Sequence, residues 1–232
     1  MQGLIDAALA NPWKTLDTVL DGPLHPGGRE ATDALLDRAG VDQGTRLLDV
    51  GCGAGDALAL ARERGGTAWG LDPDPGTDRA IRGDGAHLPL TSGSVDVVLA
   101  ECVLCLTTFD EALAESDRVL APGGRLALSD VVVADDAPDV PEQLATALCL
   151  TGARRREDLL ASVERAGFEI ASVDDHRADL LAMRERVSER IDYEGLLGTM
   201  GERGETALAA IETLEAAVED GRVGYVSVVA RK

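Results

Sequence analysis

Residues 47–56 read Leu-Leu-Asp-Val-Gly-Cys-Gly-Ala-Gly-Asp, and this stretch decides the fold that we predict. Its apolar first half is typical of a short buried strand, and the spacing of apolar residues from Asp56 to Arg64 predicts a helix. Between them lies a G-x-G-x-G loop. Because glycine has no Cβ, such a loop lets a ligand approach the backbone closely. The stretch therefore predicts a ligand-binding unit of strand, loop and helix.

Strands and helices continue to alternate after this unit. Apolar runs at 67–72, 95–100 and 125–133 predict strands, and the apolar spacing over 109–120 predicts a helix between the last two. Parallel neighbouring strands need such crossover helices. We therefore expect an α/β fold with a doubly wound, parallel sheet.

The carboxyl-terminal part follows a different pattern. A helix is expected around 155–166 and a strand at 166–173, and the charged residues 177–219 have helical composition before a final strand at 223–230. The simplest arrangement is a helical insertion between the last two strands. No internal repeat and no linker rich in proline, glycine or serine divides the chain, so we expect a single domain over 1–232.

Two acids beside the glycine loop restrict its ligand. A dinucleotide fingerprint carries a third glycine where this chain has Asp56, and a carboxylate there would repel a diphosphate. This disfavours a nicotinamide-dependent oxidoreductase. Together with Asp49, which precedes the loop, Asp56 suits a cationic ligand without phosphate. S-adenosylmethionine, which carries an ammonium and a sulfonium, is such a ligand.

Two further acids follow in the order that this ligand requires. Asp72 ends the second predicted strand, where a carboxylate can accept hydrogen bonds from both ribose hydroxyls. Asp84 lies in a Gly-Asp-Gly segment, from which it can accept from an adenine amino group. An acid at a strand end, taken alone, is more often a turn or cap residue than a ligand. The order of these acids after the glycine loop favours the ligand-binding interpretation.

The motifs resemble those of class I S-adenosylmethionine-dependent methyltransferases. The segments "LLDVGCGAG", "GLD", "GDGAHLPL" and "DRVLAPGGRLALSD" are similar to the family's successive motifs. The resemblance implies a seven-stranded, Rossmann-like sheet whose last strand is antiparallel, with a helical cap at 1–44, a cofactor-binding core at 45–135 and a substrate side at 136–232. The cofactor-binding residues that it implies, together with our inferences, are Asp49, Gly51, Gly53, Gly55, Asp72, Asp84 and Glu101.

Charge and composition indicate the kind of partner. Asp and Glu total 42 against 22 Lys and Arg, giving a net charge of −20 that repels nucleic acid. No apolar run approaches the ~20 residues of a membrane span, and the first residues lack the basic region of a signal peptide. We expect an acidic, cytoplasmic protein with reduced thiols that acts on a small molecule as a monomer or homodimer.

The segment Glu-Cys-Val-Leu-Cys-Leu at 101–106 follows the third clear strand, at the edge that faces the methyl group in this fold. A closed zinc site needs four ligands, and no second ligand pair is present, so we expect no metal site. The apolar residues between the cysteines disfavour a redox pair. Glu101 and Cys102 are therefore candidate catalytic residues on the substrate side, whereas Cys105 is expected to face the core.

Arsenite methyltransferases give a second local resemblance. Their Asn-Cys-Val is similar to "ECV" here, and their substrate loop is similar to "CLTGAR" at 149–154, which makes Cys149 a third candidate catalytic residue and a metalloid thiolate. Cys149 could equally be a small buried apolar residue. Gly221 stands where that group has another cysteine.

Methyl transfer to a small-molecule acceptor is the leading hypothesis. Thiol-dependent arsenite methylation is one alternative, and a non-catalytic binding protein that uses residues 177–219 is another. Upstream of the glycine loop, His25 could be a lid or proton-handling residue, or could belong to a Pro-Gly turn before a helix.

Overall fold

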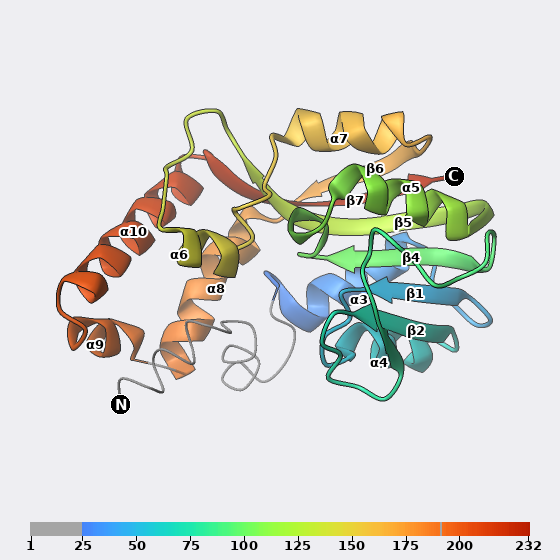
Figure 1. The fold of residues 1–232 in the computed structure, drawn as a ribbon, viewed down its shortest axis with the longest axis horizontal. Helices are drawn as coiled ribbons and strands as arrows, with labels where there is room; N and C mark the ends of the chain where they lie inside the picture. Colours follow the sequence, from blue (N-terminus) through green and yellow to red (C-terminus); the bar gives the residue numbers. More distant parts are fainter. Residues whose placement is uncertain (1–24, 191) are drawn as a thin grey trace.

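A seven-stranded sheet runs through the computed structural model, which describes residues 25–190 and 192–232 (Figure 1). The strand order is β3-β2-β1-β4-β5-β7-β6. β7 is antiparallel to both of its neighbours, β5 and β6, and the remaining pairs are parallel. The predicted α/β class, with its antiparallel last strand, is confirmed. The strands are β1 (Arg46–Val50), β2 (Thr67–Asp72), β3 (Ala80–Arg82), β4 (Val95–Glu101), β5 (Leu120–Val133), β6 (Glu169–Asp175) and β7 (Val223–Arg231).

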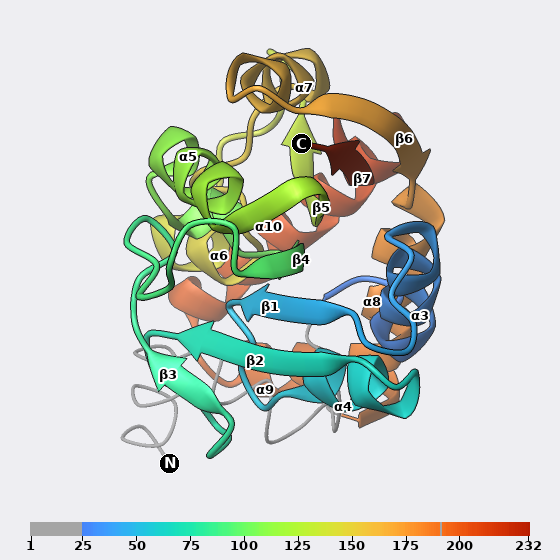
Figure 2. The ribbon, with the colours of Figure 1, turned by 90° about the vertical axis from the view of Figure 1, so that its right-hand side faces the viewer.

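Helices cover both faces of the sheet because its central strands are apolar on both sides. In β1, Leu48 and Val50 belong to one buried cluster and Leu47 to another. Figure 2 shows helices on both faces of the twisted sheet. On one face lie α5 (Phe109–Val119) and α7 (Arg156–Arg165), and on the other α3 (Gly28–Arg38) and α4 (Asp56–Glu63).

The predicted helical insertion lies between β6 and β7, beyond the carboxyl ends of the parallel strands (Figure 1). It comprises α8 (Arg177–Arg190), α9 (Tyr193–Gly198) and α10 (Glu202–Glu219), and α6 (Glu142–Ala147) lies beside it. Leu214 and Val218 of α10 pack with Val131 and Tyr225 of the sheet in a third apolar cluster. The insertion is therefore attached to the edge of the sheet where the candidate residues lie.

Several boundaries differ from the sequence prediction. β5 begins at Leu120 rather than at residue 125, because Leu120 pairs with Val95 before the register shifts. β6 begins at Glu169 rather than at 166, because Gly167, with φ of 101°, ends α7 in the left-handed conformation. The short elements β3 and α6 were not predicted.

The N-terminal cap predicted over 1–44 is described only in part. Residues 1–24 lie outside the described residues. Within the remainder, α3 packs through Leu35 and Leu36 on the same face as α4. This helix is therefore a layer of the sheet's own core.

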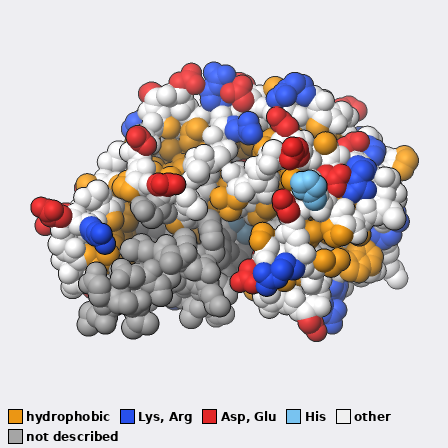
Figure 3. Space-filling model, in the orientation of Figure 1, with side chains coloured by type: hydrophobic (Ala, Val, Ile, Leu, Met, Phe, Trp, Pro, Cys, Tyr) orange, Lys and Arg blue, Asp and Glu red, His pale blue; other side chains and the backbone are white. Residues whose placement is uncertain are grey.

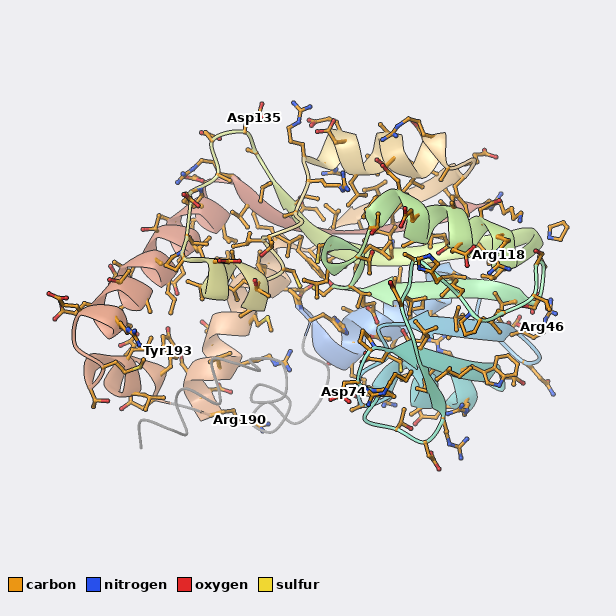
Figure 4. All side chains as sticks on the ribbon, in the orientation of Figure 1. Arg46, Asp74, Arg118, Asp135, Arg190 and Tyr193 are labelled. Atoms are coloured by element: carbon orange, nitrogen blue, oxygen red, sulfur yellow. The ribbon has the colours of Figure 1, made fainter. Side chains whose placement is uncertain are left out.

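The two edges of the parallel strands differ in chemistry. Figure 4 shows Arg46 at the edge remote from the insertion and Asp74 at the edge that faces it. Arg46 forms a two-pronged ion pair with Asp96, with an Nη2–Oδ1 distance of 2.7 Å. The ion pair at the edge remote from the insertion therefore has a structural role, whereas the edge that faces the insertion carries the glycine loop. None of the described helices is long and apolar enough to cross a membrane.

We expect Gly152→Ala to destabilise the protein. A Cβ on Gly152 would lie 1.8 Å from the carbonyl oxygen of Cys105, so the loop that carries Cys149 would have to move away from the segment after β4. Overpacking of this kind lowers the free energy of unfolding by about 1–3 kcal/mol, which urea denaturation would measure.

Gly198→Ala is the matched control. Gly198 ends α9, and a Cβ there meets nothing within 4 Å, so its stability should stay within about 0.5 kcal/mol or rise slightly. Equal stability of the two variants would show that Gly152 is not a close contact.

Candidate active site

The glycine loop between β1 and α4 combines one blocked position and one open position. Gly51, Gly53 and Gly55 all have positive φ, at 79°, 48° and 92°. A Cβ on Gly51 would lie 2.0 Å from a methyl carbon of Val103, whereas a Cβ on Gly53 would meet nothing within 4 Å. The backbone at Gly53 therefore borders open space, as a loop that receives a ligand should.

Asp72, at the end of β2, is tied to this loop. Its Oδ2 accepts a hydrogen bond from the backbone N–H of Gly53 at 3.0 Å, and its Oδ1 accepts one from Asp74 N–H at 2.7 Å. These are turn-stabilising bonds, but a carboxylate can accept about four hydrogen bonds. Asp72 can thus hold the loop and still accept from a ligand.

Asp84 lies in a turn further along the same edge. Its side chain is 63% exposed, and its Oδ1 accepts a hydrogen bond from Ala86 N–H at 3.0 Å. His87 lies 3.7 Å away across the turn. Asp84 therefore lies in a turn, as one of the two interpretations expects. Because its side chain is exposed, its carboxylate can accept a hydrogen bond from a further donor.

Asp49 and Glu101 are buried close together at the ends of adjacent strands. Asp49 pairs with Leu99 of β4, and Glu101 lies two residues further on, so both side chains point to the α3 face. Asp49 is 4% exposed, and the Glu101 side chain 8%. Burial first, then the charges of Glu101, Asp72 and Asp56, raise the pKa of Asp49 well above its usual value. The pair disfavours its own ionisation and would be stabilised by a bound cation.

Glu101 is joined to the N-terminal side of the site by a hydrogen-bonded chain. Thr32 of α3 donates to its Oε2 at 3.0 Å, and Nε2 of His25 lies 3.0 Å from the same hydroxyl and 3.6 Å from Oε2. Burial raises the pKa of Glu101, and His25, Thr32 and His176 oppose that rise. Thr32 was missed by the sequence prediction, since nothing in its local sequence distinguishes it from a buried helical threonine.

The cysteines Cys102, Cys105 and Cys149 gather in the third apolar cluster, close to the end of β4. Cys149 donates from its Sγ to the carbonyl of Cys102 at 3.4 Å, and Cys102 Sγ lies 3.6 Å from the Tyr225 hydroxyl. Among the described residues, Cys102 and Cys149 are also the two non-glycine residues with positive φ, at 54° and 59°. Strained backbone of this kind is concentrated at functional sites.

These thiols are held in the neutral form. The hydrogen bond with Cys149, then burial, raises the pKa of Cys102 well above its usual value. The pKa of Cys105 is raised to about 11, because burial and the nearby Asp130 outweigh the opposing bond from Cys149. Across residues 25–190 and 192–232, no three His, Cys, Asp or Glu side chains are arranged to hold a metal ion.

A row of Ser227, His176 and Asp179 has the spacing of a hydrolytic triad. His176 Nε2 lies 2.7 Å from Ser227 Oγ, and its Nδ1 lies 3.0 Å from Asp179 Oδ2. Ser227, however, is only 2% exposed and accepts a hydrogen bond from Arg38 at 2.5 Å. A buried hydroxyl bound to a guanidinium cannot attack a substrate, so the row joins β7, α8 and α3 structurally.

Comparison with known proteins places this chain in a family. A family model described as "Methyltransferase domain" matches residues 48–128. Methyltransferase GfsG from Streptomyces halstedii is 32% identical over 78% of this chain and 73% of its own. The 27-O-demethylrifamycin SV methyltransferase from Amycolatopsis mediterranei (strain S699) is 30% identical over 88% of this chain and 84% of its own. An arsenite methyltransferase from Halobacterium salinarum is 34% identical, but over only 58% of this chain and 40% of its own.

Solved structures give the same answer for the fold. The [4+2]-cyclase SpnF superposes with a TM-score of 0.72 at 27% identity, over 97% of this chain and 92% of that one. A geranyl diphosphate methyltransferase in complex with S-adenosylmethionine has a TM-score of 0.71 at 18% identity, over 88% and 84% of the two chains, and shows the fold alone. Since relatives at 30–32% identity match over most of both chains, this chain belongs to the class I S-adenosylmethionine-dependent methyltransferases.

Proposed function

We propose that the enzyme transfers the methyl group of S-adenosylmethionine to a small organic molecule held between the carboxyl edge of the sheet and the helical insertion. The observation that carries the proposal is the buried pair Asp49 and Glu101 beside the open backbone of Gly53. Two buried carboxyl groups at one edge favour a ligand that brings positive charge. The ammonium and sulfonium of the cofactor supply that charge.

The other predicted residues fit the remaining parts of the cofactor. Asp72 would accept from the ribose hydroxyls while it holds Gly53, and the exposed Asp84 would accept from the adenine amino group. When bound, the cofactor supplies a methyl carbon that the sulfonium makes electrophilic. The protein's own contribution is to hold the acceptor atom in line with that carbon and to exclude water.

The acceptor side is largely apolar. Leu106 and Leu148 are 45% and 40% exposed, and the partly buried Cys102 packs with the apolar cluster beneath them. Figure 3 shows hydrophobic side chains gathered where the insertion meets the sheet. Exposed apolar surface beside a few polar groups is typical of a pocket for a small organic ligand.

A turnover assay tests the proposal directly. The enzyme, S-adenosylmethionine and a panel of hydroxylated apolar molecules are incubated, and the demethylated cofactor is quantified together with the mass of the methylated acceptor. Because one similar solved structure is named a cyclase, both products are needed. Binding of the cofactor without turnover on any class of small organic acceptor would contradict the proposal.

We expect Asp72→Ala to weaken binding of S-adenosylhomocysteine by about 1.5–3 kcal/mol, the scale of charge-assisted hydrogen bonds. The substitution removes the ribose acceptor and also frees the N–H of Gly53. Isothermal titration calorimetry measures the change. Asp74→Ala is the control, because that side chain is 71% exposed and paired with Arg82. Similar affinities for the two variants would mean that Asp72 does not contact the cofactor.

Two loop variants should separate folding from binding. Gly53→Ala places a methyl group in the open space, so we expect a stability loss of only about 1–2 kcal/mol for the left-handed residue and at least a tenfold loss of cofactor affinity. Gly51→Ala drives a methyl group into Val103 and should cost more stability. Urea denaturation and calorimetry measure both properties. Unchanged affinity in a folded Gly53→Ala variant would place the cofactor elsewhere.

Thiol-dependent methylation of a trivalent metalloid is a second candidate, because the structure brings Cys102, Cys105 and Cys149 together. Gly221, which stands in place of a further cysteine, has φ of 84° and lies beside Arg177 rather than these thiols.

We expect no methylarsenical when the enzyme is supplied with arsenite, glutathione and cofactor, and arsenic speciation by chromatography and mass spectrometry checks this. Methylarsenicals from the native enzyme that disappear in a folded Cys149→Ser variant would establish the second candidate instead.

A further inference from the structure

We propose that His25, acting through Thr32 and Glu101, takes up the proton that the acceptor loses, which makes the methylated atom a protic oxygen or nitrogen. This inference rests on the proposed function, because it requires the cationic cofactor to lie beside Glu101. The three residues come from the turn before α3, from α3 itself and from the end of β4. Their side chains are buried, so water does not compete for the bonds between them.

The hydrogen-bond partner of His25 Nδ1 shows whether this nitrogen carries a hydrogen. Nδ1 lies 3.0 Å from the carbonyl oxygen of Pro26, which can only accept, so Nδ1 carries a hydrogen. The other nitrogen, Nε2, faces the Thr32 hydroxyl at 3.0 Å and Glu101 Oε2 at 3.6 Å. The proton that His25, Thr32 and Glu101 can gain or lose is therefore bound on the Nε2 side of the imidazole.

Without that proton, the hydrogen-bonded chain of His25, Thr32 and Glu101 lacks one donor. If His25 is neutral and Glu101 ionised, the single hydroxyl hydrogen of Thr32 faces Nε2, Oε2 and, at 3.4 Å, the carbonyl of Gly28. A hydroxyl has one hydrogen to donate, so a buried acceptor is left without a donor. A buried unpaired acceptor is costly.

One added proton satisfies the chain in either of two directions. Protonated His25 donates to Thr32, which donates to ionised Glu101, or protonated Glu101 donates to Thr32, which donates to neutral His25. The two arrangements interconvert when the Thr32 hydroxyl gives its proton to one neighbour and takes a proton from the other. Thr32 therefore connects the buried carboxyl group of Glu101 with the imidazole of His25, which comes from the turn before α3.

Charged groups from every neighbouring element act on this proton. Asp49 of β1 favours keeping it, and His176, before α8, opposes protonation of Glu101. Asp179 and Arg186 of α8 lie beside the turn at Gly27 and Gly28, and they bring one charge of each sign. The remaining variable is the cofactor, whose positive charge favours loss of the proton.

Methyl transfer removes the positive charge of the cofactor. The acceptor oxygen or nitrogen forms a bond to the methyl carbon, the carbon–sulfur bond breaks, and its electron pair neutralises the sulfonium. The acceptor's hydrogen leaves as a proton. At that moment the cation that disfavoured protonation of the chain has disappeared, so Glu101 and then His25 can hold the released proton.

Calorimetry with the two cofactor forms tests this without knowledge of the acceptor. S-adenosylmethionine and S-adenosylhomocysteine differ by the methyl group and the sulfonium charge. Titrations at one pH in buffers of different ionisation enthalpy give the protons released on binding. We expect S-adenosylmethionine to release more, by up to about one proton, and its affinity to rise with pH more steeply.

Variants then locate the proton. His25→Gln and Thr32→Val should reduce the difference in proton release between the two cofactor forms to the part that Asp49 and Glu101 supply, whereas Thr32→Ser should keep the full difference. His87→Gln, which removes an 82% exposed histidine, should retain it. The two Thr32 variants keep the test decisive if His25→Gln does not fold, since valine preserves the shape of threonine and serine its hydroxyl.

The inference is overturned if both forms release equal numbers of protons, or if the difference is undiminished in folded His25→Gln or Thr32→Val variants. Equal proton release with intact binding would leave the proposed function standing. Absence of binding by both forms would overturn the cofactor site and this inference together.

Discussion

The burial of two carboxyl groups at one edge of the sheet is the constraint on which the site depends. Register fixes it, because Asp49 and Leu99 are paired and the pleat then turns Glu101 to the same face. Taking a carboxylate out of water costs several kcal/mol unless it is protonated or paired. An edge built in this way is less stable by itself than with a cation bound, and the family's cofactor is such a cation.

The non-glycine residues of the described chain that have a left-handed backbone, Cys102 and Cys149, lie near the same edge of the sheet. Cys102 directly follows Glu101, and Cys149 lies in the loop that Gly152 presses against Cys105. Left-handed conformations cost non-glycine residues about 1–2 kcal/mol each, so surrounding contacts must enforce them. The apolar cluster of the insertion supplies those contacts, since Leu214 and Tyr225 pack beside the thiols. The insertion therefore shapes the segment after β4 as well as covering it.

The sequence predicted those parts of the fold whose signal is local. Buried parallel strands read as apolar runs, so β1, β2 and β4 were found almost to the residue, and the glycine loop was recognised by residue type. β3 and α6 were not found because a strand of three residues and a helix of six carry too little periodicity. The start of β5 depends on pairing with Val95, which no local pattern records.

The sequence proposed candidate site residues only where they adjoin a motif. The glycines, Asp49 and Asp72 follow from the loop, and Glu101 follows from its place after a strand. Thr32 is 69 residues from Glu101, and a buried threonine on a helix gives no signal of its partner. The position of Cys105 also depended on tertiary structure. It is buried, as spacing suggested, yet the short helical turn at Leu104–Leu106 brings it to Cys149.

The charge of the two buried carboxyl groups at the edge of the sheet affects each stage of the proposed reaction. With the proposed cofactor bound, Asp49 and Glu101 would lie beside a positively charged sulfonium, and after transfer they would lie beside a neutral sulfur. The interaction that held the substrate form is then weakened, while the cost of burying the carboxyl groups is unchanged. A proton moving onto Glu101 lowers that cost, but it also removes the charge that attracted the cofactor. The same change that absorbs the acceptor's proton therefore favours release of the product, and loss of that proton to solvent restores the charge that attracts the cationic form.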